Sequence, residues 1–282
     1  MIIRFFSPAY LLYLFVAAGL TVLCYALFKD RSARTQNTLL LALMGFNVFQ
    51  HFAKSILWPH LYGTGFGLSN TAYNVCAFLI LASPAVFFAK SSILRQALSY
   101  FGTAAGWSAM LLPQWFLGKT MLQWEFLRFF VCHALLAITS LLPALWGRVR
   151  FRFSDGWIFG LLFLLMEGII LLDNVVCVES DLFAKNGKTL YECLSELNPF
   201  WMICPPESPA MVVLFDLLSP SFFFQPARGI CVPVLWNCVP FYLGSTMLAY
   251  LLGALFERLQ RRAVRKNPRV RFNIPVKNRY VP

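Results

Sequence analysis

Four polar side chains occur at helical spacing within an otherwise apolar stretch of the chain. Asn47, Gln50, His51 and Lys54 fall at positions i, i+3, i+4 and i+7, so one helix face carries all four. Ionisable groups within a bilayer are costly and by default face protein or a polar cavity. The stripe therefore predicts a buried polar site.

Other apolar segments contribute polar residues that we expect at the same depth, in one half of the bilayer. They are Asn74, Cys76, Arg128, His133, Glu167, Asn174 and Asn237. A thiol and an imidazole suit acyl transfer, with Cys76 as nucleophile, His133 or His51 as base and a carboxylate such as Glu167 orienting the ring. Lys54 and Arg128 could stabilise an oxyanion or hold a lipid phosphate.

The same residues are also compatible with plainer roles. A lone Cys in an apolar helix usually packs as a small hydrophobe. Intramembrane His commonly hydrogen-bonds a neighbouring helix. Glu167 could form a structural ion pair with Lys54 or Arg128.

The composition indicates an all-α, polytopic membrane protein. Apolar residues make up 59% of the 282 and charged residues 13%, against about 45–50% and about 25% in soluble domains. A helix needs about 20 apolar residues to span a bilayer. Seven segments qualify: 8–28, 39–59, 70–89, 96–113, 125–146, 156–176 and 232–256. The fourth is the least apolar of them, because it contains Gly102, Thr103, Gly106 and Ser108.

Basic residues predict the orientation of these spans. They gather in alternate connections, around 29–34, 90–95 and 148–152, and in the tail after residue 257. The positive-inside rule then places the N-terminus outside and the tail in the cytoplasm. We expect a seven-span domain over 1–257, with an outer loop at about 177–231, and a basic tail over 258–282. The net charge of +12 thus indicates contact with membrane lipids and not with nucleic acid.

The outer loop contains a second group of cysteines. Cys177, Cys193, Cys204 and Cys231 lie in or beside it, and one or two disulfides could form among them in an oxidising compartment. No CxxC pair occurs, so the sequence predicts neither a metal nor a cofactor. The loop is long enough for an outer cap or a re-entrant element.

Several short motifs resemble the YwaF-like integral membrane family, which includes transmembrane protein 164. They are Tyr73-Asn74-Val75-Cys76, Tyr100-Phe101-Gly102 leading to Pro113, Phe129-Phe130-Val131-Cys132-His133, and Asn198-Pro199 followed by Pro205. The resemblance implies a multi-span fold with an intramembrane site. For the eukaryotic branch it implies cysteine-dependent transfer of a fatty acyl chain between phospholipids, with Cys76 and His133 as the site. The family motif has Pro, Leu and His where this chain has Ala72, Tyr73 and Asn74.

Two other classes of function remain open at this stage. A transporter or small-molecule-binding membrane protein could use the same buried polar residues without covalent chemistry. A structural role could use the outer loop as a contact surface, although the sequence names no protein partner. The absence of a cleavable targeting segment fits a bacterial inner membrane.

Overall fold

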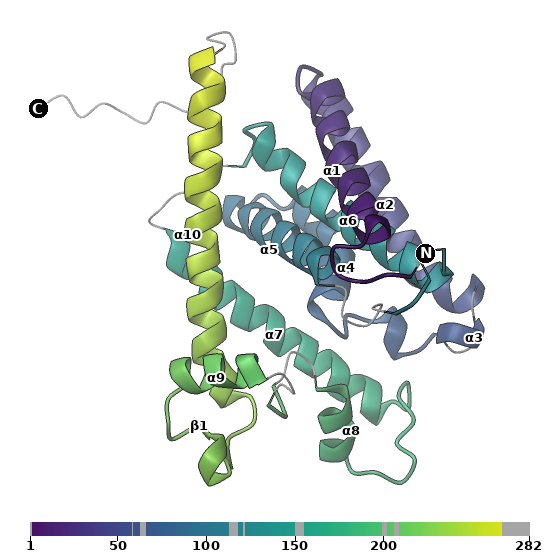
Figure 1. Cartoon of the computed structure of the whole chain (residues 1–282), viewed down its shortest axis with the longest axis vertical. Helices are drawn as coiled ribbons and strands as arrows, with labels where there is room; N and C mark the ends of the chain where they lie inside the picture. The colour runs from purple at the N-terminus through teal and green to yellow at the C-terminus, as the bar shows by residue number, and fades with distance from the viewer. Residues whose placement is uncertain are drawn as a thin grey trace, which may run out of the picture.

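The computed structural model describes residues 2–57, 59–62, 66–112, 118–120, 122–149, 155–198, 202–205 and 209–266. The helices are α1 (Pro8–Phe28), α2 (Ala33–Leu57), α3 (Pro59–Tyr62), α4 (Val75–Phe88), α5 (Ser92–Leu111), α6 (Trp124–Leu145), α7 (Gly156–Glu179), α8 (Leu190–Leu197), α9 (Pro209–Leu218) and α10 (Leu235–Lys266). Short 3₁₀ turns occupy Leu68–Asn70 and Pro226–Arg228, and strands β1 (Phe224–Gln225) and β2 (Ile230–Cys231) form a small antiparallel hairpin. Figure 1 shows the long helices gathered into one bundle.

A helix occupies each of the seven segments predicted to span the membrane, which confirms the all-α membrane class. By length and composition, five helices could cross a bilayer: α1, α2, α6, α7 and α10. The apolar helix α4 has 14 residues, or about 21 Å, which is shorter than a hydrocarbon core of about 30 Å. The 20-residue helix α5 is less apolar than these five. The count of seven spans and their orientation stay predictions.

The chain alternates between two ends of the bundle. The tail end of the bundle is the end where α2 and α5 begin and where α4 and α6 end. The loop end is the opposite end. The segment after α7 folds at the loop end into α8, α9 and the hairpin (Figure 1). The sequence predicted an outer cap or a re-entrant element for this segment, and the choice between the two stays a prediction.

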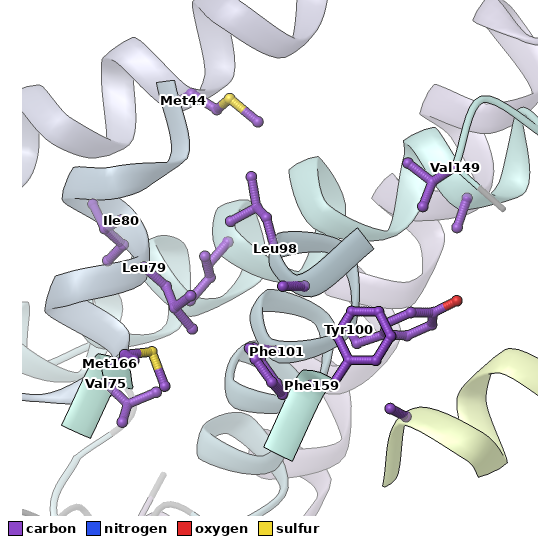
Figure 2. Close-up of a cluster of buried hydrophobic side chains, with 14 of the residues drawn as sticks. Met44, Val75, Leu79, Ile80, Leu98, Tyr100, Phe101, Val149, Phe159 and Met166 are labelled. Carbon is purple, nitrogen blue, oxygen red and sulfur yellow. The ribbon is translucent and has the colours of Figure 1, made fainter. Parts of the chain in front are cut away.

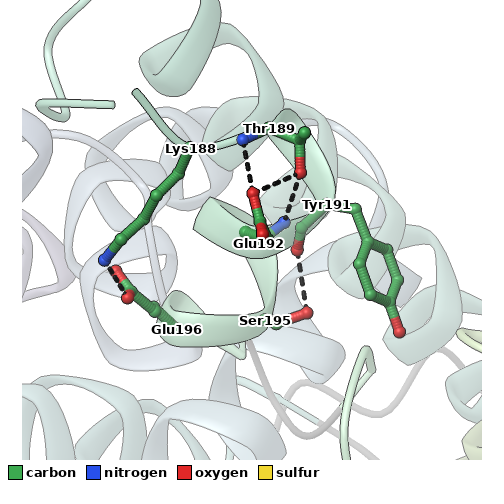
Figure 3. Close-up of polar contacts among 6 residues, drawn as sticks. All are labelled: Lys188, Thr189, Tyr191, Glu192, Ser195 and Glu196. Atoms are coloured by element: carbon green, nitrogen blue, oxygen red, sulfur yellow. Dashed lines mark hydrogen bonds and ion pairs between the residues drawn. The ribbon is translucent and has the colours of Figure 1, made fainter. Parts of the chain in front are cut away.

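Helix α8 begins at a capping box outside the long helices. The Thr189 hydroxyl accepts from the Glu192 backbone N–H at 3.3 Å, and the Glu192 carboxylate accepts from the Thr189 N–H at 2.7 Å (Figure 3). Lys188 and Glu196 form an ion pair across the same helix. The hydrogen bonds that the Glu192 carboxylate accepts from Thr189 lower the pKa of the Glu192 carboxyl.

The main apolar core lies between α4, α5 and α7. Figure 2 shows Leu79 of α4, Phe101 of α5 and Phe159 of α7 in this cluster. Helix α5 packs closely on α6 because it has glycines at the contact: a Cβ at Gly102 would meet the Ser140 side chain, and one at Gly106 would meet the His133 carbonyl oxygen. The small residues that make α5 less apolar therefore permit close helix packing.

All eight cysteines are free thiols in the structure. Loop disulfides are therefore absent here, although the Cys204 thiol lies close enough to Cys231 to interact with it electrostatically. Several predicted features lie outside the described residues, namely Pro113, Pro199 and the tail over 267–282.

Candidate functional site

The polar stripe of α2 faces α6. The Asn47 side chain is buried and its Nδ2 donates to the backbone carbonyl of Cys132 at 3.0 Å. Gln50 Nε2 donates to Asn47 Oδ1 at 2.8 Å. Both predicted ligand-binding amides thus form a hydrogen-bonded link between two helices, as the plainer interpretation of such residues anticipates.

The side chains of His51 and Lys54 are buried, although both residue types are ionisable. Their exposed fractions are 4% and 2%. The Lys54 ammonium lies 5.8 Å from the centroid of the Tyr73 ring, and the Arg128 guanidinium is near enough for its charge to act on both residues. His51 Nε2 is buried without a hydrogen-bond partner among the described residues. One polar ring nitrogen is therefore available for a ligand.

The imidazole of His133 sits between two thiols. Its Nδ1 lies 2.7 Å from the Phe129 carbonyl oxygen and 3.3 Å from the Cys132 sulfur, and the Cys76 thiol is near enough to interact electrostatically with the ring. A carbonyl oxygen can only accept, so Nδ1 carries the proton of this bond. In the neutral ring Nε2 is then the basic nitrogen.

The two thiols differ in access and in their hydrogen bonds. Cys76 is half-buried in the first turn of α4, where the helix dipole favours negative charge. Cys132 is 6% exposed, and its S–H donates to the Phe129 carbonyl at 3.2 Å. Cys76 is therefore the more exposed of the two thiols.

Two predicted ligand-binding amides serve the local fold. Asn74 is the N-cap of α4, since its Oδ1 accepts from the Ala77 N–H at 2.9 Å. Asn174 Nδ2 donates to the Tyr73 carbonyl at 3.1 Å and to the Ile170 carbonyl at 2.8 Å. Together they fix the start of α4, which bears Cys76, against α7.

Glu167 does not orient the imidazole, contrary to the expectation from its residue type. The Phe129 carbonyl performs that task, because backbone four residues earlier on the same helix is within reach of Nδ1. Glu167 Oε1 is buried and finds no hydrogen-bond partner within the described ranges, and the Cys238 thiol of α10 is an electrostatic neighbour. The described residues also contain no ion pair of Glu167 with Lys54 or Arg128. Asn237, 1% exposed, likewise lies on α10.

The site thus gathers polar groups from α2, α4, α6 and α7, which we call the loop-end cluster: Asn47, Gln50, His51, Lys54, Tyr73, Asn74, Cys76, Arg128, Cys132, His133 and Asn174. Sequence reasoning missed Tyr73 and Cys132 as members, although Cys132 directly precedes His133. Among the described residues, no group of three or more His, Cys, Asp or Glu is placed to hold a metal ion.

Comparison with known proteins places the chain in a family. A family model described as the TMEM164 family matches residues 5–225, which include all of α1 to α9 and the whole loop-end cluster. Comparisons with curated proteins and with solved structures gave no match. The five long apolar helices agree with an integral membrane protein. Because the match extends over most of the 282 residues, this integral membrane protein belongs to the TMEM164 family.

Proposed function

We propose that this protein transfers acyl chains between membrane lipids through a thioester on Cys76, with His133 as the base. The observation that supports it best is the nearness of the Cys76 thiol to the His133 ring, whose Nδ1 is held by the Phe129 carbonyl. This is the arrangement of nucleophile, base and orienting group that acyl transfer requires.

In the first half-reaction the Cys76 sulfur attacks the ester carbonyl of a donor lipid. The thiol proton passes to His133, the ester C–O bond breaks, and the protonated imidazole returns that proton to the departing lipid hydroxyl. In the second half, His133 takes the proton of an acceptor hydroxyl, whose oxygen attacks the thioester and releases the Cys76 thiol. Attack by water instead would give hydrolysis of the same intermediate.

The surrounding cations suit the charges that this chemistry creates. The tetrahedral intermediates have a negative oxygen, which Lys54 and Arg128 could stabilise within a buried site. The same two groups could hold the phosphate of the donor lipid. His51 Nε2, which has no partner among the described residues, would accept a hydrogen bond from a hydroxyl of the lipid.

The test compares the wild type and three variants of the full-length protein, each reconstituted with a phospholipid that has a labelled acyl chain. Cys76→Ala and His133→Ala should each lower label transfer by about 100-fold or more. Cys132→Ala is the matched control, because it removes a neighbouring thiol that lies farther from solvent, and it should retain most of the activity. Intact-mass measurement should detect an acyl adduct on the wild type that is absent from Cys76→Ala. Unchanged transfer in Cys76→Ala and His133→Ala, at normal protein levels, would exclude this function.

A non-covalent binder is the second candidate, favoured by the unpartnered His51 Nε2. A binder should tolerate Cys76→Ser, because serine preserves the size and polarity of the side chain. It should lose ligand uptake or retention in His51→Ala. An acyltransferase should show the reverse dependence, with the larger loss at Cys76.

A further inference from the structure

The tail end of the bundle contains a cavity that has no part in the proposed acyl transfer. Its volume is about 300 Å³, and α2, α4, α5 and α6 contribute to its walls. The residues that line it include Asn37, Met44, Phe87, Phe88, Arg95, Ser140 and Arg148. Cys76 and His133 are not among them, and they lie near the other ends of the same helices.

Two guanidinium groups line this cavity. Arg95 is in the first turn of α5, and Arg148 follows α6, where its backbone N–H donates to the Pro143 carbonyl at 2.9 Å and folds the chain over the helix end. Partial burial and, second, the nearby charge of Arg95 lower the pKa of Arg148. Within the described residues, neither guanidinium forms an ion pair with a carboxylate. Two like charges therefore meet at one opening, an arrangement that an anion would stabilise.

The cavity wall also contains polar atoms whose hydrogen bonds are not made. The side chain of Ser140 is 1% exposed, and its Oγ has no hydrogen-bond partner in the part of the chain that the structure describes. Asn37 Oδ1 is likewise buried without one, and an Asn amide can rotate to present its NH₂ group instead. A buried polar group without a partner costs free energy, so a ligand that fills its hydrogen bond is favoured. Helices α2 and α5 also begin at this end, which adds the positive ends of their dipoles.

The remaining wall is apolar and partly open. Met44 is 1% exposed and lies in the interior, whereas Phe88 is 69% exposed at the helix end. A ligand with an anionic group and an attached hydrocarbon would satisfy both kinds of surface. A phospholipid with its headgroup at the interface has this chemistry.

We propose that the tail-end cavity binds the phosphate group of an anionic membrane lipid, held by Arg95 and Arg148 with Ser140 as an additional donor. This site is separate from the loop-end cluster and does not depend on the proposed acyl transfer. Its occupant would brace α2, α5 and α6 against one another at this end of the bundle.

The experiment measures thermal unfolding of the full-length protein in neutral detergent during titration with three probes. The probes are short-chain phosphatidic acid, short-chain phosphatidylcholine and inorganic phosphate. Phosphatidic acid should stabilise the wild type most. In Arg95→Gln/Arg148→Gln the apparent Kd for phosphatidic acid should rise by at least about tenfold, and Arg95→Lys/Arg148→Lys should recover part of the affinity because the charge returns.

Matched controls separate this site from general basic character and from the loop end. Lys90→Gln removes an exposed charge between α4 and α5 that does not line the cavity, and it should leave the Kd unchanged. Cys76→Ala should also bind phosphatidic acid normally. Equal stabilisation of the wild type and Arg95→Gln/Arg148→Gln, or an equal loss in Lys90→Gln, would overturn the proposal. Inorganic phosphate acting as strongly as the lipid would overturn the lipid as its source.

Discussion

The loop-end cluster and the tail-end cavity share three helices, α2, α4 and α6, yet they satisfy their polar groups in different ways. At the loop end, Asn47 bonds the Cys132 carbonyl and His133 bonds the Phe129 carbonyl, so protein groups already hold the side chains in place. At the tail end, the Ser140 hydroxyl has no partner and two guanidiniums face one opening. The first arrangement suits chemistry, which needs fixed geometry, and the second suits recognition, which needs unfilled hydrogen bonds.

Two glycines of α5, one helical turn apart, pack against residues of the two regions. Gly106 packs against the backbone of His133 and Ala137, whereas Gly102 packs against the Ser140 side chain. A backbone cannot yield without moving its helix, but a side chain can rotate. The same substitution should therefore have unequal effects at the two sites.

The largest effect is expected from Gly106→Ala. The new methyl group would come within 2.7 Å of the His133 carbonyl oxygen, so α5 and α6 would have to separate. We expect the free energy of unfolding to fall by about 3 kcal/mol, with a loss of acyl transfer because His133 moves. Unfolding in mixed micelles and the labelled-lipid assay would measure the two effects. Retained stability would show that the helix contact is looser than the structure has it.

A smaller effect confined to the loop end is expected from Asn47→Leu. This change removes the donor to the Cys132 carbonyl and the acceptor for Gln50, at a cost of about 1 kcal/mol. Acyl transfer should fall, while the affinity for phosphatidic acid at the tail end should stay as in the wild type. Equal losses in both assays would mean that the two regions are not independent.

Gly102→Ala should affect the tail end and leave the loop end active, the reverse of Asn47→Leu. Its methyl group would lie 2.0 Å from the Ser140 hydroxyl oxygen, which can rotate away, and 2.8 Å from Ser140 Cβ, which requires a small shift between α5 and α6, so the cost should be about 1 kcal/mol. Phosphatidic acid binding should weaken because the hydroxyl loses its position, and acyl transfer should persist. If transfer fell and lipid binding did not, the assignment of the two glycines would be reversed.

The smallest effect is expected from Thr189→Ala on α8, which belongs to neither region. Loss of the cap should speed hydrogen exchange of the α8 amides about fivefold, with both lipid assays unchanged. The pKa of Glu192, lowered by its bonds to Thr189, should rise toward its ordinary value of about 4.3 in NMR titration. In the wild type the stability linked to this carboxylate is present above that ordinary pKa and is lost as the pH falls through the folded value. A Glu192 pKa unaltered in Thr189→Ala would exclude the Thr189 hydroxyl as a cause of the lowered pKa and leave the backbone N–H.

Sequence periodicity anticipated much of the loop-end cluster. The spacing of Asn47, Gln50, His51 and Lys54 put them on one helix face, and counting along antiparallel helices put Cys76 and His133 at a similar depth. It could not determine which atoms meet, because hydrogen bonds depend on helix rotation and on the crossing of helices. Glu167 illustrates this limit: its carboxylate was expected near the imidazole, but its helix turns that side chain toward Cys238 of α10.

The tail-end cavity was not anticipated at all. Arg95 and Arg148 counted only among the basic residues that predict orientation, and no sequence pattern singled out Ser140. By itself the sequence determined the membrane class and the helical segments, because hydrophobic length and periodicity are local properties of the chain. Only the tertiary structure decided which polar groups are satisfied within the protein and which remain open to a ligand, because that depends on how residues distant in the chain pack together.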